Sequence, residues 1–451
     1  MPKITHRKKR LSSFKLIVLG FAGVIVLGAL ILMLPFSSTA GVVTPFHEAL
    51  FTSTSAVCVT GLVVQDTGSY WSAFGQTVIL LLIQIGGLGV VTVAALFAML
   101  SGRKISLMQR STMQDAISAP KVGGIVRLTR FIVRGTFLIE LIGMIVMLPT
   151  FCGNYGIKGI WMAAFHSVSA FCNAGFDILG TAENKYPSLT GYIGNPAINI
   201  TIMLLIIVGG IGFLTWDDIY TNKWHFKKYR MQSKVILVTT AILIIAPAVF
   251  FFFCDFTGLP LAERILASLF QSVTPRTAGF NTADLSAMTG SSKAIMTLLM
   301  LVGGSPGSTA GGMKTTTLAV LIMSAFSVCR KKDDAEVCGR RIDGSAVKNA
   351  AAVAVMYFLL FFVGGIVIST AEGLPLSTCL YETASAVGTV GLTLGITPQL
   401  GVLSQLILIV LMYLGRVGGL TLIYAAVSNK NHSGAKLPLS LIHISEPTRP
   451  Y

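Results

Sequence analysis

Charged residues are scarce in this chain, and acidic residues are the scarcest. Lys, Arg, Asp and Glu make up 12% of the 451 residues while hydrophobic residues make up 53%, and 34 Lys and Arg stand against 18 Asp and Glu. A chain this apolar cannot hide its hydrophobic surface in one water-soluble core, so a bilayer must cover it. The shortage of charge therefore excludes a soluble domain and predicts an integral membrane protein.

Motifs for metal, redox and hydrolytic chemistry are also missing. The seven cysteines form no Cys-x-x-Cys pair, and the six histidines form no His-Glu-x-x-His motif. An intramembrane hydrolase would need paired acids or a metal motif within its spans, but Glu140 stands alone in its apolar segment. We expect no enzyme, no disulfide framework and no bound organic cofactor.

The positive charges are segregated along the chain. Four segments, 1–15, 103–134, 223–234 and 330–348, contain 24 of the 34 Lys and Arg residues. The intervening loops, 35–75, 151–195, 256–293 and 371–403, contain five. This pattern disfavours nucleic-acid binding and follows the positive-inside rule, so we expect a multi-pass protein of the cell membrane with both termini cytoplasmic. The first apolar run, 14–34, is too long for a signal-peptide core and is interpreted as a retained first span.

A short pattern recurs four times. An aromatic residue opens a stretch of small residues, and nine or ten residues later a glycine follows: Gly61, Gly175, Gly279 and Gly391. Intervals of 114, 104 and 112 residues between these glycines predict four quasi-equivalent units. The expected units are 14–100, 121–220, 232–329 and 346–428.

Each unit is predicted to contain a span, a short helix that enters and leaves on one side, a loop and a second span. A short helix of ~12 residues cannot cross a bilayer that requires ~20. Pro45, Pro260 and Pro375 open three of these short helices, with Thr44 expected as the N-cap before Pro45. The expected helices are 14–34, 45–56, 73–100, 131–150, 157–170, 197–216, 235–254, 260–273, 294–328, 350–369, 375–386 and 402–427. The alternative is that the short helices are instead loops lying on the membrane surface, and this would have to be true in all four units. The fold prediction is an all-α membrane protein with eight spans around one central pore.

The four glycine loops, 57–61, 171–175, 275–279 and 387–391, are the predicted selectivity filter. Irregular backbone is tolerated at membrane depth where it lines water, and carbonyl rings and helix C-termini attract cations. The loops contain no Asp or Glu, which favours a monovalent ion, and their glycines can adopt positive φ. The candidate residues are Val59, Thr60, Gly61, Asn173, Ala174, Gly175, Thr277, Ala278, Gly279, Thr389, Val390 and Gly391.

Charged residues flank these loops. Asp66, Asp177 and Asp284 follow their glycines closely, and they either concentrate cations at the mouth or cap turns. Arg276, inside the third loop, must point away from a cation path, and Glu382 is its candidate partner.

Glycine pairs at 86–87, 209–210, 303–304 and 418–419 mark the second spans, and in the first two we expect them to permit close packing. The third opens ten small residues with one proline, 303–312, which should break the helix. Its spacing only approaches that of a phosphate-binding loop, because Met313 precedes Lys314 and no strand leads into it. We expect a flexible gate below the filter, with Arg416 either bonding its free carbonyls or extending to the cytoplasmic interface. The candidate gate residues are Gly303, Gly304, Ser305, Gly307, Gly311, Gly312, Lys314 and Arg416.

Together these motifs resemble the Trk/Ktr/HKT superfamily of potassium transporters. The loops read Val-Thr-Gly, Asn-Ala-Gly-Phe, Thr-Pro-Arg-Thr-Ala-Gly-Phe-Asn and Gly-Thr-Val-Gly-Leu, and the broken span contains Ser-Thr-Ala-Gly-Gly-Met-Lys. The match covers roughly 14–430, and its start on the first unit resembles the KtrB-type membrane subunit.

The resemblance implies potassium (K+) as the transported ion, held by the filter at Gly61, Gly175, Gly279 and Gly391. It also implies a homodimer and a cytosolic nucleotide-binding RCK ring of the KtrA type, and it is compatible with sodium dependence. In plant relatives that carry sodium the first glycine is a serine, so Gly61 favours potassium. A sodium-selective or potassium/sodium secondary transporter is the alternative. Residues 439–451 fit no family pattern and are interpreted as a non-native tail.

Overall fold

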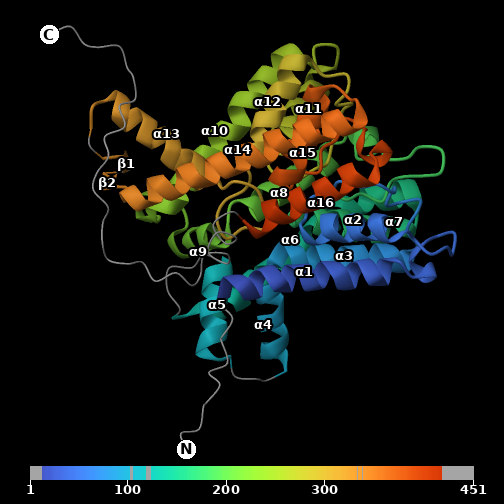
Figure 1. The fold of residues 1–451 in the computed structure, drawn as a ribbon, viewed down its shortest axis with the longest axis horizontal. Helices are drawn as coiled ribbons and strands as arrows, with labels where there is room; N and C mark the ends of the chain where they lie inside the picture. Colours follow the sequence, from blue (N-terminus) through green and yellow to red (C-terminus); the bar gives the residue numbers. More distant parts are fainter. Residues whose placement is uncertain (1–12, 102–104, 118–122, 333, 338, 419–451) are drawn as a thin grey trace, which may run out of the picture.

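The architecture is almost entirely helical. The structure, a computed structural model, describes residues 13–101, 105–117, 123–332, 334–337 and 339–418. Within them one hairpin, β1 (Glu336–Val337) with β2 (Arg340–Arg341), accompanies sixteen α-helices (Figure 1). The helices are α1 (Ser13–Leu32), α2 (Phe46–Val57), α3 (Ala73–Leu88), α4 (Val90–Leu100), α5 (Leu107–Ile117), α6 (Ile125–Tyr155), α7 (Lys158–Phe171), α8 (Pro196–Gly210), α9 (Phe213–Asn222), α10 (Met231–Cys254), α11 (Leu261–Val273), α12 (Gly290–Leu301), α13 (Thr315–Cys329), α14 (Gly344–Glu372), α15 (Leu376–Gly388) and α16 (Val402–Val417). Both chain ends, the tail 439–451 and the end of the fourth unit lie outside the described residues.

Four long helices carry the apolar exterior. By length and composition α1, α6, α10 and α14 are able to cross a membrane, and up to six spans result if two bent helix pairs count as one span each. Large hydrophobic side chains on these helices, among them Leu19, Leu138, Ile242 and Phe358, are exposed. An apolar exterior of this extent indicates contact with lipid.

Two of the expected second spans are broken, so the prediction of one continuous helix each was wrong. Helix α4 is bent by 96° from α3, and α9 by 98° from α8. The breaks occur at Gly89 (φ 85°, ψ 134°) and Gly212 (φ 91°, ψ 141°), and α16 ends at Gly418 (φ 85°, ψ 139°). This backbone conformation is not helical, so the helix ends there. Glycine adopts it easily because it has no Cβ.

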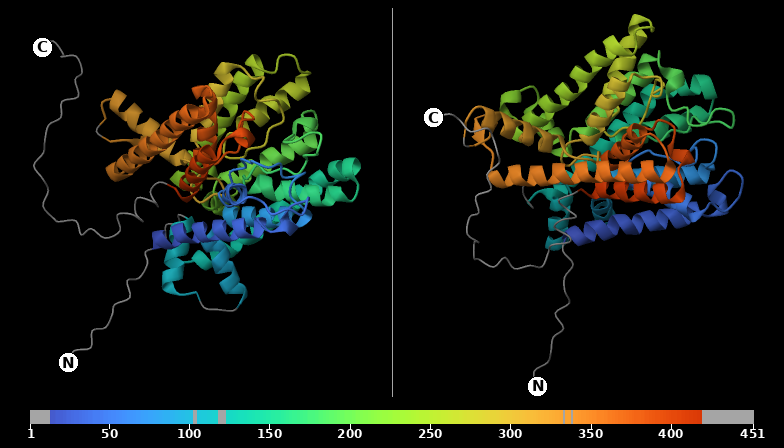
Figure 2. Two further views of the ribbon diagram at one scale, coloured as in Figure 1. Left: turned by 45° about the vertical axis from the view of Figure 1, so that its right-hand side comes forward. Right: turned by 45° about the horizontal axis from the view of Figure 1, so that its top comes forward.

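The first break also creates an element that the sequence did not predict. Helix α5 packs beside α4, and the two project from the body of the molecule as a hairpin (Figures 1 and 2). The last residue of α5, Ile117, reaches the turn at Gly307 of the 303–312 loop, where a Cβ would lie 2.5 Å from the Ile117 carbonyl oxygen. The hairpin is therefore in contact with the break in the third unit.

The four short helices are α2, α7, α11 and α15. Three begin directly after Pro45, Pro260 and Pro375, which stand at the N-cap with ψ of 139°, 147° and 131°. The prediction of Thr44 as the N-cap was wrong by one residue, because Pro45 itself is the N-cap of α2. The carbonyl of Pro45 accepts the first helical bond from Ala49 (3.0 Å) while its own extended ψ keeps the proline outside the helix.

Glycines let the second helices approach the ends of the short helices. A Cβ on these glycines would lie closer than 3.0 Å to a backbone oxygen in the last turn of a short helix: Gly86 to Val57, Gly209 to Phe171 and Gly415 to Val387. Close packing accounts for the first two glycine pairs. In the fourth unit the equivalent position is Gly415, so the alignment of residues 418–419 with these pairs was three residues out of register.

Changing Gly209 to alanine is expected to lower the melting temperature measured in detergent, because overpacking against the Phe171 carbonyl costs ~1–3 kcal/mol. Gly23→Ala is the matched control, since nothing lies within 4 Å of a Cβ there. Equal melting temperatures for the two variants would contradict the packing argument.

Candidate ion pathway

The four glycine loops share one backbone conformation. Each has a non-glycine residue at positive φ followed two positions later by a glycine at positive φ. The pairs are Val59 (52°) with Gly61 (91°), Asn173 (57°) with Gly175 (68°), Thr277 (68°) with Gly279 (84°), and Thr389 (52°) with Gly391 (94°). A bulky or β-branched residue at positive φ is uncommon and costs energy, so its recurrence at one position in all four loops indicates a functional constraint.

The loops meet in a closed ring. A Cβ on each glycine would lie closer than 3.0 Å to the backbone oxygen of the middle residue in the next loop: Gly61 to Ala174, Gly175 to Ala278, Gly279 to Val390 and Gly391 to Thr60. The order runs from the first unit to the fourth and back to the first. The structure thus brings all twelve candidate filter residues together, and only glycine fits at the four contact points.

Hydroxyl side chains that the sequence analysis missed brace the ring. The Ser55 hydroxyl accepts a bond from the Gly61 amide (3.0 Å), and the Ser385 hydroxyl accepts one from the Gly391 amide (2.9 Å). In the second loop the Ser169 hydroxyl donates to the Phe176 carbonyl (2.8 Å). A serine six residues before the glycine in three of the four units was the available signal.

Arg276 points out of the ring. Its guanidinium is buried, and Nη2 donates to Thr240 on α10 (3.3 Å). The expected pair with Glu382 is wrong, because that carboxylate accepts bonds from Thr393, the Leu394 amide (3.2 Å) and Thr397 (2.9 Å). These donors all lie in the segment directly after the fourth loop, so Glu382 anchors the chain where it leaves that loop.

The break in the third unit forms a closed loop below the ring. The Gly303 amide bonds to the Met313 carbonyl (2.7 Å), so the two ends of the 303–312 loop meet. Its middle crosses from the second unit to the fourth: the Thr309 amide bonds to the Gly209 carbonyl (3.2 Å), and the Gly312 amide to the Gly415 carbonyl (3.2 Å). The carbonyls freed where α8 and α16 end therefore serve as acceptors for the loop.

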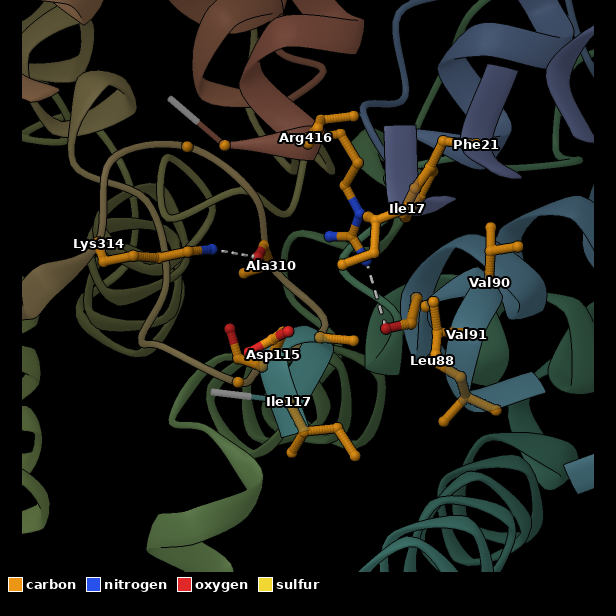
Figure 3. A pocket seen from close by; sticks show the side chains of 18 of the residues that line it. Ile17, Phe21, Leu88, Val90, Val91, Asp115, Ile117, Ala310, Lys314 and Arg416 are labelled. Atoms are coloured by element: carbon orange, nitrogen blue, oxygen red, sulfur yellow. Dashed lines mark hydrogen bonds between the residues drawn. The ribbon is translucent and has the colours of Figure 1, made fainter. Parts of the chain in front are cut away.

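Two cations approach this loop (Figure 3). Lys314 donates through Nζ to the carbonyls of Ala310 (2.9 Å) and Gly311 (3.3 Å). Arg416 donates to the carbonyl of Thr309 and, on α3, to the carbonyls of Gly86 and Gly87. Of the two expectations for Arg416, the structure has the bond to the loop and not the extension to an interface. All eight candidate gate residues lie in or against this loop.

A cavity of about 270 Å³ is lined by Gly307, Ser308, Ala310 and Gly312 of the 303–312 loop and by none of the twelve candidate filter residues. Lys314, Arg416 and Asp115 reach it from three different elements, α5 carrying Asp115 (Figure 3). The loop thus separates this cavity from the ring of glycines.

A second cavity of about 230 Å³ lies on the opposite side of the ring and is lined by all four glycines. Asp66 and Asp177 both line it. Asp66 accepts bonds from the Ser69 amide and hydroxyl and from the Tyr186 amide (3.0 Å), so it also acts as a turn anchor. Asp284 lines a different cavity and accepts a hydrogen bond from the Ser286 amide (2.9 Å). Of the three acids, two therefore face the mouth of the ring.

Asp177 should make uptake sensitive to external pH. Burial, assisted by nearby Asp66, raises its pKa to about 7 although the Leu179 amide bond lowers it. Its negative charge is therefore lost as pH falls through about 7, and the half-saturating cation concentration should rise. Tyr186 and Asp66 are the other ionisable groups lining this mouth.

The measurement is tracer uptake against external pH. Asp177→Asn should flatten the profile, whereas Asp284→Asn, in the other cavity, should leave it unchanged. An unaltered profile in the Asp177 variant would assign the titration to another group.

Known proteins resemble this chain over nearly all of its length. The family model described as TrkH, cation transport protein, matches residues 24–433. The potassium/sodium uptake protein NtpJ of Enterococcus hirae is 39% identical, over 95% of this chain and 96% of that protein. The Ktr system potassium uptake protein B of Bacillus subtilis is 38% identical, over 91% and 92%. The crystal structure of the potassium transporter TrkH from Vibrio parahaemolyticus has a TM-score of 0.72 at 18% identity, covering 94% of this chain and 86% of that one. The chain is a transporter and not an enzyme, and it belongs to the Trk/Ktr family of cation transport proteins.

Proposed function

We propose that this chain takes up potassium across the cell membrane through the ring of four glycine loops. The observation that carries the proposal is the closed contact of each glycine with a backbone oxygen of the next loop, in a ring whose four glycines all line one cavity. Backbone oxygens without carboxylates suit a dehydrated monovalent cation. The relatives named for potassium uptake agree with this choice of ion.

The 303–312 loop is the proposed gate. It is held across the path by backbone bonds to α8 and α16 and by the two cations Lys314 and Arg416. A cytosolic partner, a nucleotide-binding RCK ring of the KtrA type, would open it by moving α13, which ends at the C-cap Arg330 and is followed by Arg340 and Arg341 on β2. We further propose eight spans, a homodimer and cytoplasmic termini.

The proposed driving force for uptake is the electrochemical gradient of the transported cation. Moving one charge through 100 mV is worth about 2.3 kcal/mol, and no ATP-hydrolysing motif is present in the chain. A second candidate, coupled movement of sodium with potassium, is favoured by the name of the Enterococcus hirae relative.

The test is flux in proteoliposomes that contain the purified full chain, with and without a candidate RCK subunit. We expect rubidium or potassium entry that follows the imposed membrane potential and increases with the partner. Entry against the gradient, without any coupled ion, would rule out the channel-like mechanism. A requirement for sodium on the same side would favour the second candidate.

A further inference from the structure

Three arginine side chains from two helices line one cavity away from the ring. Arg110 comes from α5, and Arg127 and Arg130 come from the first two turns of α6. The cavity has a volume of about 380 Å³, which falls in the range of about 300–1,000 Å³ that ligand sites occupy. None of its described lining residues is acidic. The cavity therefore concentrates positive charge in a concave place.

This positive charge is not neutralised by the part of the chain that the structure describes. There, the three arginines form no ion pair and no side-chain hydrogen bond. The sequence segments 102–104 and 118–122, which flank α5, contain no Asp or Glu either. Arg230, another exposed arginine, instead pairs with both Asp217 and Asp218. The contrast indicates that the three arginines serve a negative charge from outside the chain.

The start of α6 favours an anion at the same place. Its N-cap, Gly124, makes no side-chain cap bond, and the first turn contains no acidic residue. Gly124, Ile125 and Val126 line the cavity together with the arginines. The first amides of a helix lack intrahelical acceptors, and the helix dipole is positive at this end. A phosphate in the cavity would thus meet both the guanidinium groups and the positive end of the helix.

The exposed face of α6 continues from the arginines into apolar side chains. Steps of three or four residues place one row of exposed side chains on this face. The row consists of Arg127, Arg130, Arg134, Leu138, Leu141 and Ile145. Helix α6 is long and apolar enough to cross a membrane. Positive charge therefore gives way to a lipid-facing surface along one helix, as a phosphate gives way to acyl chains along a phospholipid.

We infer that Arg110, Arg127 and Arg130 hold the phosphate of an anionic phospholipid whose acyl chains lie along the exposed row of α6. Arginine suits this role because its planar guanidinium donates two parallel bonds to a phosphate. A free phosphate would use the arginines but leave the apolar row unoccupied, so the lipid accounts for both features. With the proposed cytoplasmic termini, this end of α6 lies in the cytoplasmic leaflet, whose anionic lipids attract Lys and Arg.

The site differs from charge that only orients the chain in the membrane. The positive-inside rule requires Lys and Arg in a loop but gives them no common position. Here two separate helices bring their arginines to one cavity. A phosphate bound by both helices would link α5 to α6, so the lipid should hold the hairpin of α4 and α5 against the body of the molecule.

The test measures binding of phosphatidylglycerol to the purified full chain in mixed micelles. The lipid should raise the melting temperature and remain bound in native mass spectrometry. Arg127→Gln combined with Arg130→Gln should weaken binding by about 25-fold, because each arginine near an anionic lipid contributes about fivefold, or about 1 kcal/mol. Lys227→Gln combined with Lys228→Gln is the control, since it removes two exposed cations between α9 and α10. The control should keep the wild-type affinity.

Two further ligands separate a lipid from other sources of phosphate. Phosphatidylcholine carries a phosphate without net negative charge, and glycerol phosphate carries the charge without acyl chains. We expect neither to stabilise the protein as phosphatidylglycerol does. Phosphatidylglycerol should also slow hydrogen exchange in α5 and the first turn of α6, and the double arginine variant should lose this effect. The exchange readout is local, so it remains decisive even if the variant is less stable overall.

Four results would overturn the inference. Equal phosphatidylglycerol binding by the wild type and the double arginine variant would exclude the site, and an equal loss in the lysine control would reduce it to general surface charge. Equal stabilisation by glycerol phosphate would leave a small-anion site without a lipid. Loss of binding to a candidate RCK subunit, with lipid binding retained, would assign the arginines to protein docking. None of these measurements involves ion flux, so their failure leaves the proposed function standing.

Discussion

Replacing Gly61 with serine is expected to remove most of the discrimination between potassium and sodium while leaving ion flux measurable. A Cβ at this position would lie closer than 3.0 Å to the Ala174 carbonyl oxygen and 3.1 Å from the Gly175 Cα, at a φ of 91°. The first and second loops must therefore separate, which moves the carbonyl oxygens that replace the hydration shell of the ion. A fall of about tenfold in the permeability ratio corresponds to about 1.4 kcal/mol. Reversal potentials in mixed potassium and sodium provide the measurement.

Gly41→Ser is the control that separates backbone strain from contact. Gly41 also has positive φ, 68°, but nothing lies within 4 Å of a Cβ there. Its serine variant should pay a similar conformational cost and keep the wild-type ratio. If both variants discriminate normally, the contact between the first two loops does not set selectivity.

Changing Arg416 to glutamine is expected to raise flux in the absence of the cytosolic partner. The guanidinium links the Thr309 carbonyl of the 303–312 loop to the Gly86 and Gly87 carbonyls of α3. Hydrogen bonds from charged donors are worth about 1.5–3 kcal/mol, so loss of the link should favour the open loop by about tenfold or more. Arg230→Gln, which loses pairs with the partly exposed Asp217 and the buried Asp218 on α9, is the charge-matched control outside the ring and the 303–312 loop.

Deletion of residues 304–311 tests the same gate without changing a charge. The Gly303 amide bonds to Met313, and a Cβ on Gly303 would lie 3.0 Å from the Gly312 Cα, so the deletion joins two residues that already touch. We expect faster flux that no longer depends on the partner. A folded deletion protein with unchanged flux and full partner dependence would make the loop a packing element.

The sequence was most informative where a requirement repeats. Glycine is needed at all four contact points of the ring, so the pattern around Gly61, Gly175, Gly279 and Gly391 recurs and predicts their meeting. The break at 303–312 was predictable because nine small residues and one proline in a row cannot maintain a helix.

The remaining features depend on tertiary contacts that one sequence does not record. Glycines are tolerated inside helices, as Gly20 is in α1 and the pair 86–87 is in α3, so a glycine alone does not place the break at Gly89. The partner of Arg276 was misassigned because Glu382 satisfies its carboxylate within its own unit. Charge alone does not identify a partner when neutral donors lie closer.

The central claim is that one cation path passes through the ring of four glycine loops. Diffraction from crystals of the protein grown in rubidium, with anomalous scattering recorded at the rubidium edge, tests this claim most directly. The account predicts a peak on the ring's axis, between the mouth lined by Asp177 and the 303–312 loop, at the level of Gly61, Gly175, Gly279 and Gly391. Rubidium bound elsewhere, with no density inside the ring of a protein that transports it, would contradict the account.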